Sequence, residues 1–506
     1  MDIFKKLKKE TVFRKLLDYG LFSEKLNPIF SSASYGKWIS KEGLKVYKKR
    51  EFSTVSFHLT RNNNAPRVIE IPHPISYFRL CNEIKKNWNE IIKKIGEIDD
   101  YADRSMVIPK PNNLNKRLVS MLSYNKNKDE KFLILDKSFK AKYYVHADIA
   151  NCYPSIYSHS IPWALVGHQE AKNNMDDKSK WYNKLDFAIR SMQRNETVGI
   201  AIGPDTSIVI TELILTRVDK ALLDYKYLRY IDDYKCYCSS KEEADTFLRM
   251  LSKELEKYRL RLNPKKTEII ELPTPLDQDW VRELKAYTNK FLTAKEVTKK
   301  DINVLSEFID LALNLAKSNP GDSPIRYAVK ILSKKLYKDN DVFAFVIMYL
   351  SRLCFIYPYF IDVFDLLLAN NKPSDRILEL VEKEINSIAK EHIQYSRSDV
   401  SLWSIYIAIK YDFTIDDFEK FSNYLINDRD CLPVLMSYEY AKSKKLKTKR
   451  FFDFIDTLVT EKIEEEWWIY IYTLYFDSHR RAVFKKIAFK EFYEEMRKGK
   501  VKFIKE

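Results

Sequence analysis

Two short acidic motifs, each beside an apolar, β-prone run, most constrain what this chain can fold into. Asp148 follows the run 143–145, and the pair Asp232-Asp233 stands between the runs 225–228 and 234–238. Two adjacent carboxylates on a strand–turn–strand, with a third from another strand, can hold two divalent ions roughly 3.5–4 Å apart. Such a pair of ions clamps both oxygens of an in-line phosphoryl transfer. Because magnesium prefers carboxylates, water and phosphates, the pattern predicts a Mg²⁺ (or Mn²⁺) site made of Asp148, Asp232 and Asp233.

An Asp-Asp pair taken alone predicts an ordinary turn equally well, so the surrounding motifs decide between the two interpretations. Tyr230-Ile231-Asp232-Asp233 resembles the Tyr-x-Asp-Asp signature of reverse transcriptases. Tyr153 follows Asp148 by five residues, where those enzymes place an aromatic gate that selects deoxynucleotides. The four motifs of the resemblance occur in the order those enzymes have, which makes a chance match improbable.

The other two motifs of this resemblance concern the nucleotide. The segment 199–207 resembles the glycine-containing turn and helix that carry the template and the incoming nucleotide. The resemblance implies that Gly203 lets the backbone approach the substrate and that Ser207 opens the helix. The segment 260–267 matches the lysine-bearing loop that follows the palm, in which Lys265 or Lys266 faces the triphosphate. The choice between these two lysines stays open.

Two further phrases narrow the resemblance. Tyr157-Ser158-His159-Ser160-Ile161-Pro162-Trp163 and the Gly-Ile-x-x-Gly-x-x-x-Ser-x-x-x-Thr-Glu-Leu spacing from Gly199 to Leu213 are similar to the abortive-infection (Abi) reverse transcriptases of bacterial phage defence. The usual Pro-Gln-Gly turn and the Val-Thr-Gly phrase of other reverse transcriptases are missing, which agrees with that group. The resemblance implies a template-independent DNA polymerase that acts on deoxynucleoside triphosphates in the bacterial cytoplasm. It also implies a homo-oligomer, either a trimer or a hexamer, and a phage or host recombination protein as a partner.

The same resemblance implies a protein primer, with single-stranded DNA growing from a tyrosine of the chain itself. Tyr35-Gly36-Lys37 is similar to the priming phrase of the family, and we expect the small-residue segment 31–38 to be a loop. A phenol has an unperturbed pKa of about 10, so a metal ion would have to activate it. The chain has 33 tyrosines, and Tyr19 and Tyr47 are the alternative primers.

The net positive charge of the chain is compatible with a nucleic-acid partner, but it has a second explanation. The formal net charge of the 506-residue chain is +16, and basic side chains neutralise phosphates, although a lysine-rich bacterial composition would have the same excess. The six cysteines are scattered, and we expect buried, reduced thiols in a cytosolic protein. The most apolar stretch, 342–367, is interrupted by charges and a proline, so we expect no membrane association.

The order of elements predicts an α+β fold of two parts. Alternating apolar residues predict strands within 52–75, and the palm is expected at about 140–270, with an amphipathic helix at 241–258. Prolines at 273 and 275 mark a boundary. We expect a reverse-transcriptase-like polymerase domain over 1–275, with the priming region and fingers at about 1–140. Residues 276–506 are expected to form an α-helical repeat domain of HEAT type.

Two other functions compete with the self-primed polymerase. One is a reverse transcriptase that copies an RNA template, which RNA copurifying with the protein would favour. The other is a helical scaffold or sensor with a vestigial palm. The presence of Asp148, Asp232 and Asp233 argues against a vestigial palm, and a harmless Asp232→Ala change would revive it.

Overall fold

The computed structural model describes residues 7–45, 47–49, 51–61, 65–98, 103–107, 117–119 and 128–505. It divides into two compact units, of which unit 1 comprises Met1–Val55, Ile69–Leu276 and Phe489–Glu506, and unit 2 comprises Ser56–Val68 and Asp277–Ala488. Neither unit is continuous in sequence, because the segment Ser56–Val68 belongs to unit 2 and the C-terminal segment Phe489–Glu506 belongs to unit 1.

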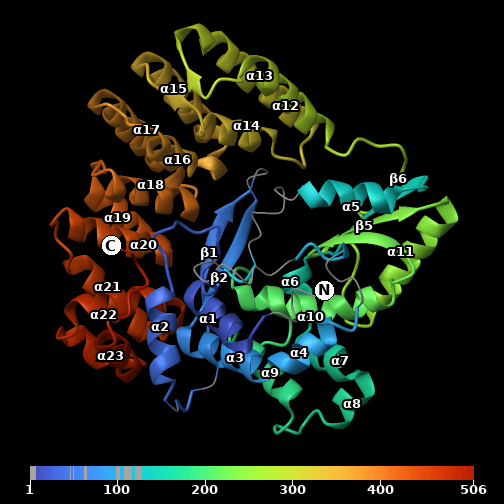
Figure 1. Cartoon of the computed structure of the whole chain (residues 1–506). Coiled ribbons are helices and arrows are strands. Elements are labelled where there is room, and N and C mark those ends of the chain that lie inside the picture. Colours follow the sequence, from blue (N-terminus) through green and yellow to red (C-terminus); the bar gives the residue numbers. More distant parts are fainter. Residues whose placement is uncertain are drawn as a thin grey trace. The chain divides into compact units, whose positions relative to one another are not determined.

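Unit 1 is organised around a four-stranded antiparallel sheet of order β4-β5-β3-β6 (Figure 1). Its strands are β3 (Tyr143–Asp148), β4 (Lys226–Tyr230), β5 (Asp233–Cys238) and β6 (Glu268–Glu271). The strands expected around both acidic motifs are therefore present. β3 pairs with β5 along its full length, which places Tyr143 opposite Cys238 and Asp148 opposite Asp233.

Side chains alternate between the two sides of β5, and two different helices pack on this sheet. Helix α11 (Lys241–Glu256) packs on β3 and β5, and helix α5 (Lys128–Ser138) packs on β4 and β5. Cys236 and Cys238 are buried with their sulfurs 3.7 Å apart. The hydroxyl of Tyr230 at the end of β4 donates to Glu130 of α5. The helix expected at 241–258 is confirmed as α11, which packs against the sheet.

The other helices of unit 1 support this sheet and its loops. Helix α10 (Asp205–Lys220) is buried along nearly its whole length and packs against α4, α7 and α11. Strands β1 (Thr54–Thr60) and β2 (Pro66–Pro72) form a separate two-stranded sheet, where strands were expected, and their segment Ser56–Val68 belongs to unit 2. The remaining helices are α1 (Lys9–Tyr19), α2 (Ala33–Glu42), α3 (Pro74–Lys86), α4 (Trp88–Ile95), α6 (Cys152–Ser155), α7 (Ser160–Val166), α8 (His168–Asn173), α9 (Trp181–Arg190) and α23 (Lys490–Lys498).

The expectation of a loop at 31–38 is wrong, because helix α2 begins at Ala33. Serine and glycine have modest helix propensity, but tertiary packing outweighs propensity here. Tyr35 and Ile39, one helical turn apart, are both fully buried. Gly36 is needed where α2 meets α1, since a Cβ at this position would lie 2.0 Å from Oδ1 of Asp18.

The C-terminal segment holds α2 in place. The N–H of Ser31 donates to the carbonyl of Phe503 at 2.8 Å, and the N–H of Lys505 donates to the carbonyl of Ile29 at 2.9 Å. The ring of Phe503 lies 5.7 Å from the ring of Tyr35. The last residues of the chain therefore complete the core around the N-terminal helices.

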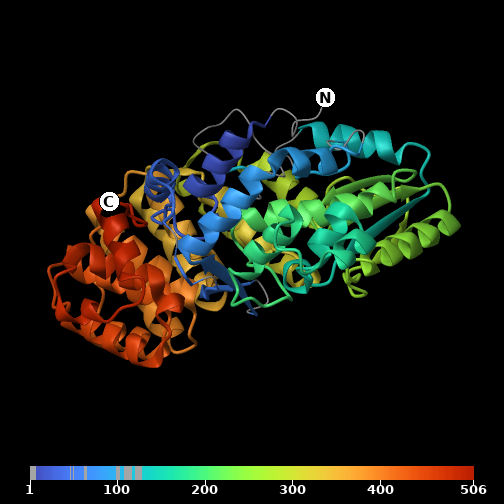
Figure 2. The ribbon, with the colours of Figure 1, turned by 90° about the horizontal axis from the view of Figure 1, so that it is seen from below.

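Unit 2 is a succession of helices that pack on near neighbours in the sequence, as in a solenoid (Figures 1 and 2). Contacts run from α12 to α13 and α14, then through α15, α17, α18, α20 and α22. Its helices and short strands are α12 (Asp279–Phe291), β7 (Glu296–Val297), α13 (Ile302–Ser318), α14 (Pro324–Leu332), β8 (Leu336–Tyr337), α15 (Asn340–Ile356), α16 (Val363–Asn370), α17 (Asp375–Ile393), α18 (Ser398–Lys410), α19 (Phe418–Asp428), α20 (Cys431–Ser443), α21 (Lys449–Glu461) and α22 (Trp468–Ser478). The fold is therefore α+β, as predicted.

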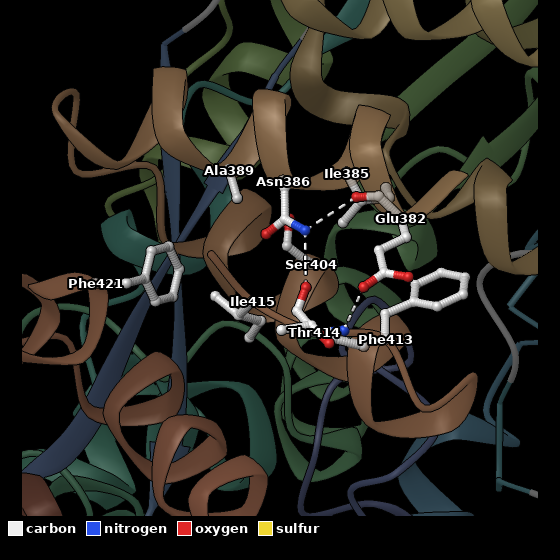
Figure 3. Close-up of a pocket in the computed structure, with 10 residues that line it drawn as sticks. Glu382, Ile385, Asn386, Ala389, Ser404, Phe413, Thr414, Ile415 and Phe421 are labelled. Carbon is white, nitrogen blue, oxygen red and sulfur yellow. Dashed lines mark hydrogen bonds between the residues drawn. The ribbon is translucent and has the colours of Figure 1, made fainter. Parts of the chain in front are cut away.

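Polar contacts fix the loop between α18 and α19 to α17. Asn386 donates from Nδ2 to the carbonyl of Thr414 at 2.8 Å, and the N–H of Thr414 donates to Glu382 at 2.7 Å (Figure 3). The small cavity beside them has a volume of about 10 Å³, roughly the space of one water molecule. In the described ranges, every helix is too short or too polar to cross a bilayer.

We predict that Phe503→Ala loosens α2. Phe503 is 2 % exposed, and truncating a buried phenylalanine costs about 3–5 kcal/mol. Hydrogen exchange of the amides in 33–42 should accelerate in this variant. The matched control is Phe139→Ala, at a ring that is 66 % exposed, which should leave exchange in α2 unchanged. Unaltered α2 protection in Phe503→Ala would contradict the packing described.

Candidate functional site

The three carboxylates of the two acidic motifs lie together at one end of the sheet. Asp148 ends β3 directly opposite Asp233, the first residue of β5, and Asp232 occupies the turn before it. The N–H of Ile149 donates to the carbonyl of Asp232 at 3.0 Å. Two motifs separated by more than eighty positions in the sequence therefore form one acidic centre, defined here as Asp148, Asp232 and Asp233.

Burial and mutual repulsion perturb the acidic centre. Burial, followed by the charges of Asp233 and Asp148, raises the pKa of Asp232 to about 6. Burial also acts to raise the pKa of Asp233, but hydrogen bonding and charge from His146 and the contact with Asp148 outweigh it and lower that pKa. Nε2 of His146 lies 3.4 Å from Oδ1 of Asp233. A cation placed among these oxygens would relieve the repulsion.

Polar side chains from the loop after α11 contact Asp148. Nδ2 of Asn263 donates to Oδ2 of Asp148 at 3.0 Å, and Nζ of Lys266 lies 3.3 Å from Oδ1. The N–H of Lys265 donates to the side chain of Asn263 at 3.2 Å, and its side chain is exposed. The structure therefore directs Lys266 to the acidic centre, while Lys265 shapes the loop through its backbone.

A buried ion-pair network supports the turn that carries Asp232. Arg229 is fully buried and pairs with Glu212 at 2.8 Å and with Asp219 at 2.7 Å. Its NH1 also donates to the carbonyl of Ile231 at 3.0 Å. Ile231 has a positive φ of 60°, which a β-branched residue adopts only when its surroundings enforce it. Tyr234 completes the network by donating to Asp219 at 3.0 Å.

The gate candidate and the glycine-containing turn are joined through their backbones. Tyr153 is half-buried in α6, and its carbonyl accepts from the N–H of Ile200 at 3.0 Å. Ser207 is buried and donates from Oγ to the carbonyl of Ala201 at 2.6 Å. Helix α10 begins at Asp205, so the expectation that Ser207 opens it is wrong by two residues. Through this hydrogen bond Ser207 instead links helix α10 to the glycine-containing turn.

Gly203 lies where a side chain would collide with the protein. Its φ is 128°, and an added Cβ would lie 2.9 Å from Cγ2 of Ile69 and 3.2 Å from Cβ of Ser23. The neighbouring N–H of Glu70 donates to the carbonyl of residue 202 at 2.9 Å. In the structure the glycine is required by backbone conformation and by packing against β2, and any approach to a nucleotide adds to these requirements.

Tyr35 does not join the acidic centre. Its side chain is fully buried, and its hydroxyl donates to the carbonyl of Pro74 at 2.7 Å. Burial raises the pKa of this phenol well above its usual value. Its ring neighbours are Trp38 and Phe503. None of these three described neighbours of Tyr35 is Asp148, Asp232 or Asp233.

The carboxylate oxygens of the acidic centre are the kind of ligand that magnesium prefers. They do not already form a complete set of metal ligands among the described residues. Within the described ranges, no group of three or more His, Cys, Asp or Glu side chains already stands at ligand positions. Magnesium commonly uses only one or two carboxylates and completes its shell with water and substrate phosphates. Asp148 and Asp232 would hold it. The arrangement suits in-line phosphoryl transfer between oxygens.

Two residues of this site were missed by sequence reasoning. His146 precedes Asp148 by two positions, and the period of a strand puts such residues on one face, so this signal was readable. Arg229, immediately before the Tyr-x-Asp-Asp phrase, had no readable signal, because its partners Glu212 and Asp219 become known only when α10 is placed under the sheet.

We predict that Asp232→Asn stabilises the metal-free protein at pH 8. The folded pKa of Asp232, about 6, exceeds the unperturbed value of about 3.9, so folding stability is lost as pH rises through this interval and stays lost above it. Removing the charge should restore about 1–3 kcal/mol, or roughly 2–6 °C in Tm. The gain should shrink towards pH 4.

The control for this measurement is Asp224→Asn, at an exposed aspartate of the same unit. Magnesium should raise the Tm of the wild type and leave that of Asp232→Asn nearly unchanged. A Tm gain that is equal at pH 8 and pH 4 would contradict the repulsion described.

We predict that Gly203→Ala costs about 1–3 kcal/mol through backbone strain and the contact with Ile69. Gly321→Ala is the matched control, because nothing lies within 4 Å of a Cβ there. Chemical denaturation of both variants measures the difference. Equal stabilities would show that the turn adapts freely.

Comparison with known proteins adds a domain assignment. Residues 72–305 match the family described as "Reverse transcriptase (RNA-dependent DNA polymerase)". A search of curated protein sequences finds no match. Among solved structures, apo telomerase from Candida Tropicalis truncated from its C-terminal domain is 15 % identical over 48 % of this chain, with a TM-score of 0.28. Apo telomerase from the same organism is 13 % identical, with 84 % of this chain and 76 % of that chain covered and a TM-score of 0.30.

The chain spans 55 % of the truncated telomerase that it matches, and at TM-scores this low the likeness carries no argument about this chain. The family match includes the whole acidic centre and the loop that carries Lys266. Residues 72–305 therefore form a reverse transcriptase domain, and such a domain implies a nucleotidyltransferase.

Proposed function

We propose that this chain is a magnesium-dependent DNA polymerase of the reverse transcriptase type, which adds deoxynucleoside monophosphates to a hydroxyl primer. The observation that carries the proposal is the register that sets Asp148 opposite Asp233, with Asp232 on the adjoining turn. When bound there, magnesium would stabilise the charge of the transferring phosphoryl group and activate the attacking hydroxyl.

The side chains around the acidic centre have separate roles in this proposal. Asp148 and Asp232 hold the cation, and Asn263 fixes the rotamer of Asp148 through its 3.0 Å hydrogen bond. Lys266 is 62 % exposed at its side chain, so it can leave Asp148 and neutralise a triphosphate. Tyr153 packs under the sugar and excludes a 2′-hydroxyl.

We propose further that the first hydroxyl is supplied by the chain itself, without a template. The Tyr35-Gly36-Lys37 phrase and the absence of the Pro-Gln-Gly turn support this proposal. In the priming step, Oη of Tyr35 attacks the α-phosphorus of a deoxynucleoside triphosphate and the bond to the β-phosphate oxygen breaks. Pyrophosphate leaves, the phenolic proton passes to solvent, and a tyrosyl phosphodiester remains.

The burial of Tyr35 sets a condition on this step. The phenol is hydrogen-bonded to Pro74 and covered by Phe503, so α2 must separate from the C-terminal segment before attack. Tyr47 is a less enclosed alternative, since it is half-buried and donates to Glu495 at 3.0 Å. Tyr19, also half-buried, is the other.

The same burial favours a second candidate function, an RNA-templated reverse transcriptase that extends a nucleic-acid primer. This function requires no movement of α2, because the hydroxyl arrives on the primer strand. It places the same demands on Asp148 and Asp232, so the two candidates differ in the primer and in the template.

The biological setting that we propose is abortive-infection defence against phage, by a homo-oligomer of three or six chains. The phrase from Tyr157 to Trp163 and the spacing from Gly199 to Leu213 support it. Analytical ultracentrifugation distinguishes the two assemblies, and phage plating on cells that carry the wild type or Asp232→Asn tests the defence. Equal plating on both strains would contradict it.

We predict that the purified chain, given magnesium and labelled deoxynucleotides without primer or template, becomes covalently labelled. Asp232→Asn should abolish the label, because one ligand of the cation is lost. Tyr35→Phe should abolish it while preserving the fold, since it removes one hydrogen bond worth about 1 kcal/mol. The control is Tyr395→Phe, at a tyrosine that is 57 % exposed.

The outcomes separate the candidates. Label that persists in Tyr35→Phe but not in Asp232→Asn moves the primer to another tyrosine. Labelling that requires an added primed RNA template identifies the templated enzyme. Wild type that stays inactive under both conditions contradicts the polymerase proposal itself.

A further inference from the structure

A pocket of unit 1 with a volume of about 720 Å³ is lined by residues of α7, α8 and α9 and of the segments beside these helices. Its size falls within the range of small-molecule sites in proteins. None of the residues that line it belongs to the acidic centre. Several residues of the phrase from Tyr157 to Trp163 line this pocket. The proposed polymerase chemistry gives that phrase no role.

Aromatic rings form one wall of this pocket. The rings of Tyr157 and Trp163 lie 5.6 Å apart, and the exposed ring of His168 lies 4.8 Å from that of Trp163. Phe187 of α9 adds a half-buried ring. The guanidinium of Arg259 lies 4.1 Å from the centre of the Tyr157 ring and 5.7 Å from that of the Trp163 ring. The rings of Tyr157 and Trp163 are inclined by 57° and those of Trp163 and His168 by 53°, so a flat aromatic ligand can stack on one ring of this wall and contact the edge of another.

The charge around the pocket is mainly positive. Lys172, Lys178 and Lys184 line it and are exposed. Of the two carboxylates in the lining, the buried Asp186 is already neutralised, because Nδ1 of His159 lies 2.8 Å from it and Arg190 pairs with it at 3.3 Å. Asp176 is the other acidic group in the lining. These three lysines, defined here as the lysine rim, give the pocket a basic edge that suits an anion.

Hydrogen bonds hold the backbone of the loop that carries Lys178. Nδ2 of Asn183 donates to the carbonyl of Asn174 at 2.7 Å and to that of Asp177 at 2.9 Å. Oδ1 of Asp177 accepts from the N–H of Ser179 at 2.8 Å. These bonds close the loop that carries Lys178. The pocket is preformed, which lowers the conformational entropy lost on binding.

The pocket is also joined to the glycine-containing turn. Tyr157 forms a β-bridge with Val198, and the N–H of Ser158 donates to the carbonyl of Thr197 at 2.8 Å. The next residue, Gly199, donates to the carbonyl of Ile156 at 2.8 Å. A ligand that contacts Tyr157 therefore binds next to the backbone that leads into the glycine-containing turn.

We propose that this pocket is a second nucleotide-binding site, which takes one nucleoside phosphate with its base against the aromatic wall and its phosphates on the lysine rim. Stacking on aromatic rings together with a basic groove is how proteins hold single strands without reading their sequence. The ligand is a unit of a single strand or a free nucleotide, since both offer a base and a phosphate. The site does not rest on the polymerase proposal, because binding here needs neither metal nor primer.

The test is equilibrium binding by the full-length chain in EDTA, so that polymerisation is absent. The probes are a fluorescent twelve-residue oligothymidylate and, as competitor, dATP alone. If Lys172 and Lys184 each contact a phosphate, Lys172→Gln/Lys184→Gln should bind the oligonucleotide about 25-fold more weakly at 0.1 M salt and reduce the salt slope by about 1.4. Lys241→Gln/Lys253→Gln is the matched control, with two exposed lysines at the same spacing in α11.

His168→Ala tests the wall separately, at an exposed ring that the fold does not need. It should weaken binding about fivefold or more, in line with roughly 1–3 kcal/mol per stacked base. An oligonucleotide that carries 4-thiothymidine should crosslink to peptides within 157–190. Competition by dATP, lost in the same variants, identifies a free nucleotide as a ligand, and its absence identifies a strand.

Equal weakening in the pocket and control variants would overturn the proposal, because it would show a diffuse effect of charge. Crosslinks that map only outside 157–190 would overturn it as well. Failure of these tests leaves labelling in the priming assay unaffected, so the two proposals fail independently.

Discussion

The buried pairing of Arg229 with Glu212 and Asp219 is the interaction on which the acidic centre depends. It ties helix α10 to strand β4 and, through the carbonyl of Ile231, fixes the strained turn that presents Asp232. A buried arginine with two carboxylate partners is expensive to desolvate, and breaking such a pair typically costs about 3–5 kcal/mol. What it provides here is geometry, because the same guanidinium also binds the carbonyl of Ile231 in the turn.

That support allows an arrangement which would otherwise be unfavourable. Asp148, Asp232 and Asp233 are brought together by strand register although their charges repel, and burial together with this repulsion raises the pKa of Asp232. Lys266 offsets part of the repulsion from an exposed position at the edge of the centre. The site therefore carries a net negative charge that a divalent ion would neutralise. We therefore expect the metal-free protein to be less stable than a variant with a neutral side chain at residue 232, as is common where function and stability conflict.

Much of this could be predicted from the sequence, and the reasons for success and failure are physical. The strands around Asp148 and Asp232-Asp233 follow from local β-propensity, and the helix at 241–256 follows from its period. The helix at 33–42 was missed because it is stabilised by residues 501–505, at the opposite end of the chain. The burial of Tyr35 depends likewise on distant residues, Pro74 and Phe503. Arg229 was missed because its partners Glu212 and Asp219 are recognised only once helix α10 is packed beside β4. The roles of Tyr153, Gly203 and Lys265 towards a nucleotide stay predictions.

The measurement that tests the central claim most directly is a manganese titration followed by electron paramagnetic resonance, in the presence of a non-hydrolysable deoxynucleoside triphosphate. If the acidic centre is a polymerase site, the wild type should bind about two ions per chain together with the nucleotide. Asp148→Asn and Asp232→Asn should each lose at least one of them. Identical ion stoichiometry in the wild type and both variants would contradict the account.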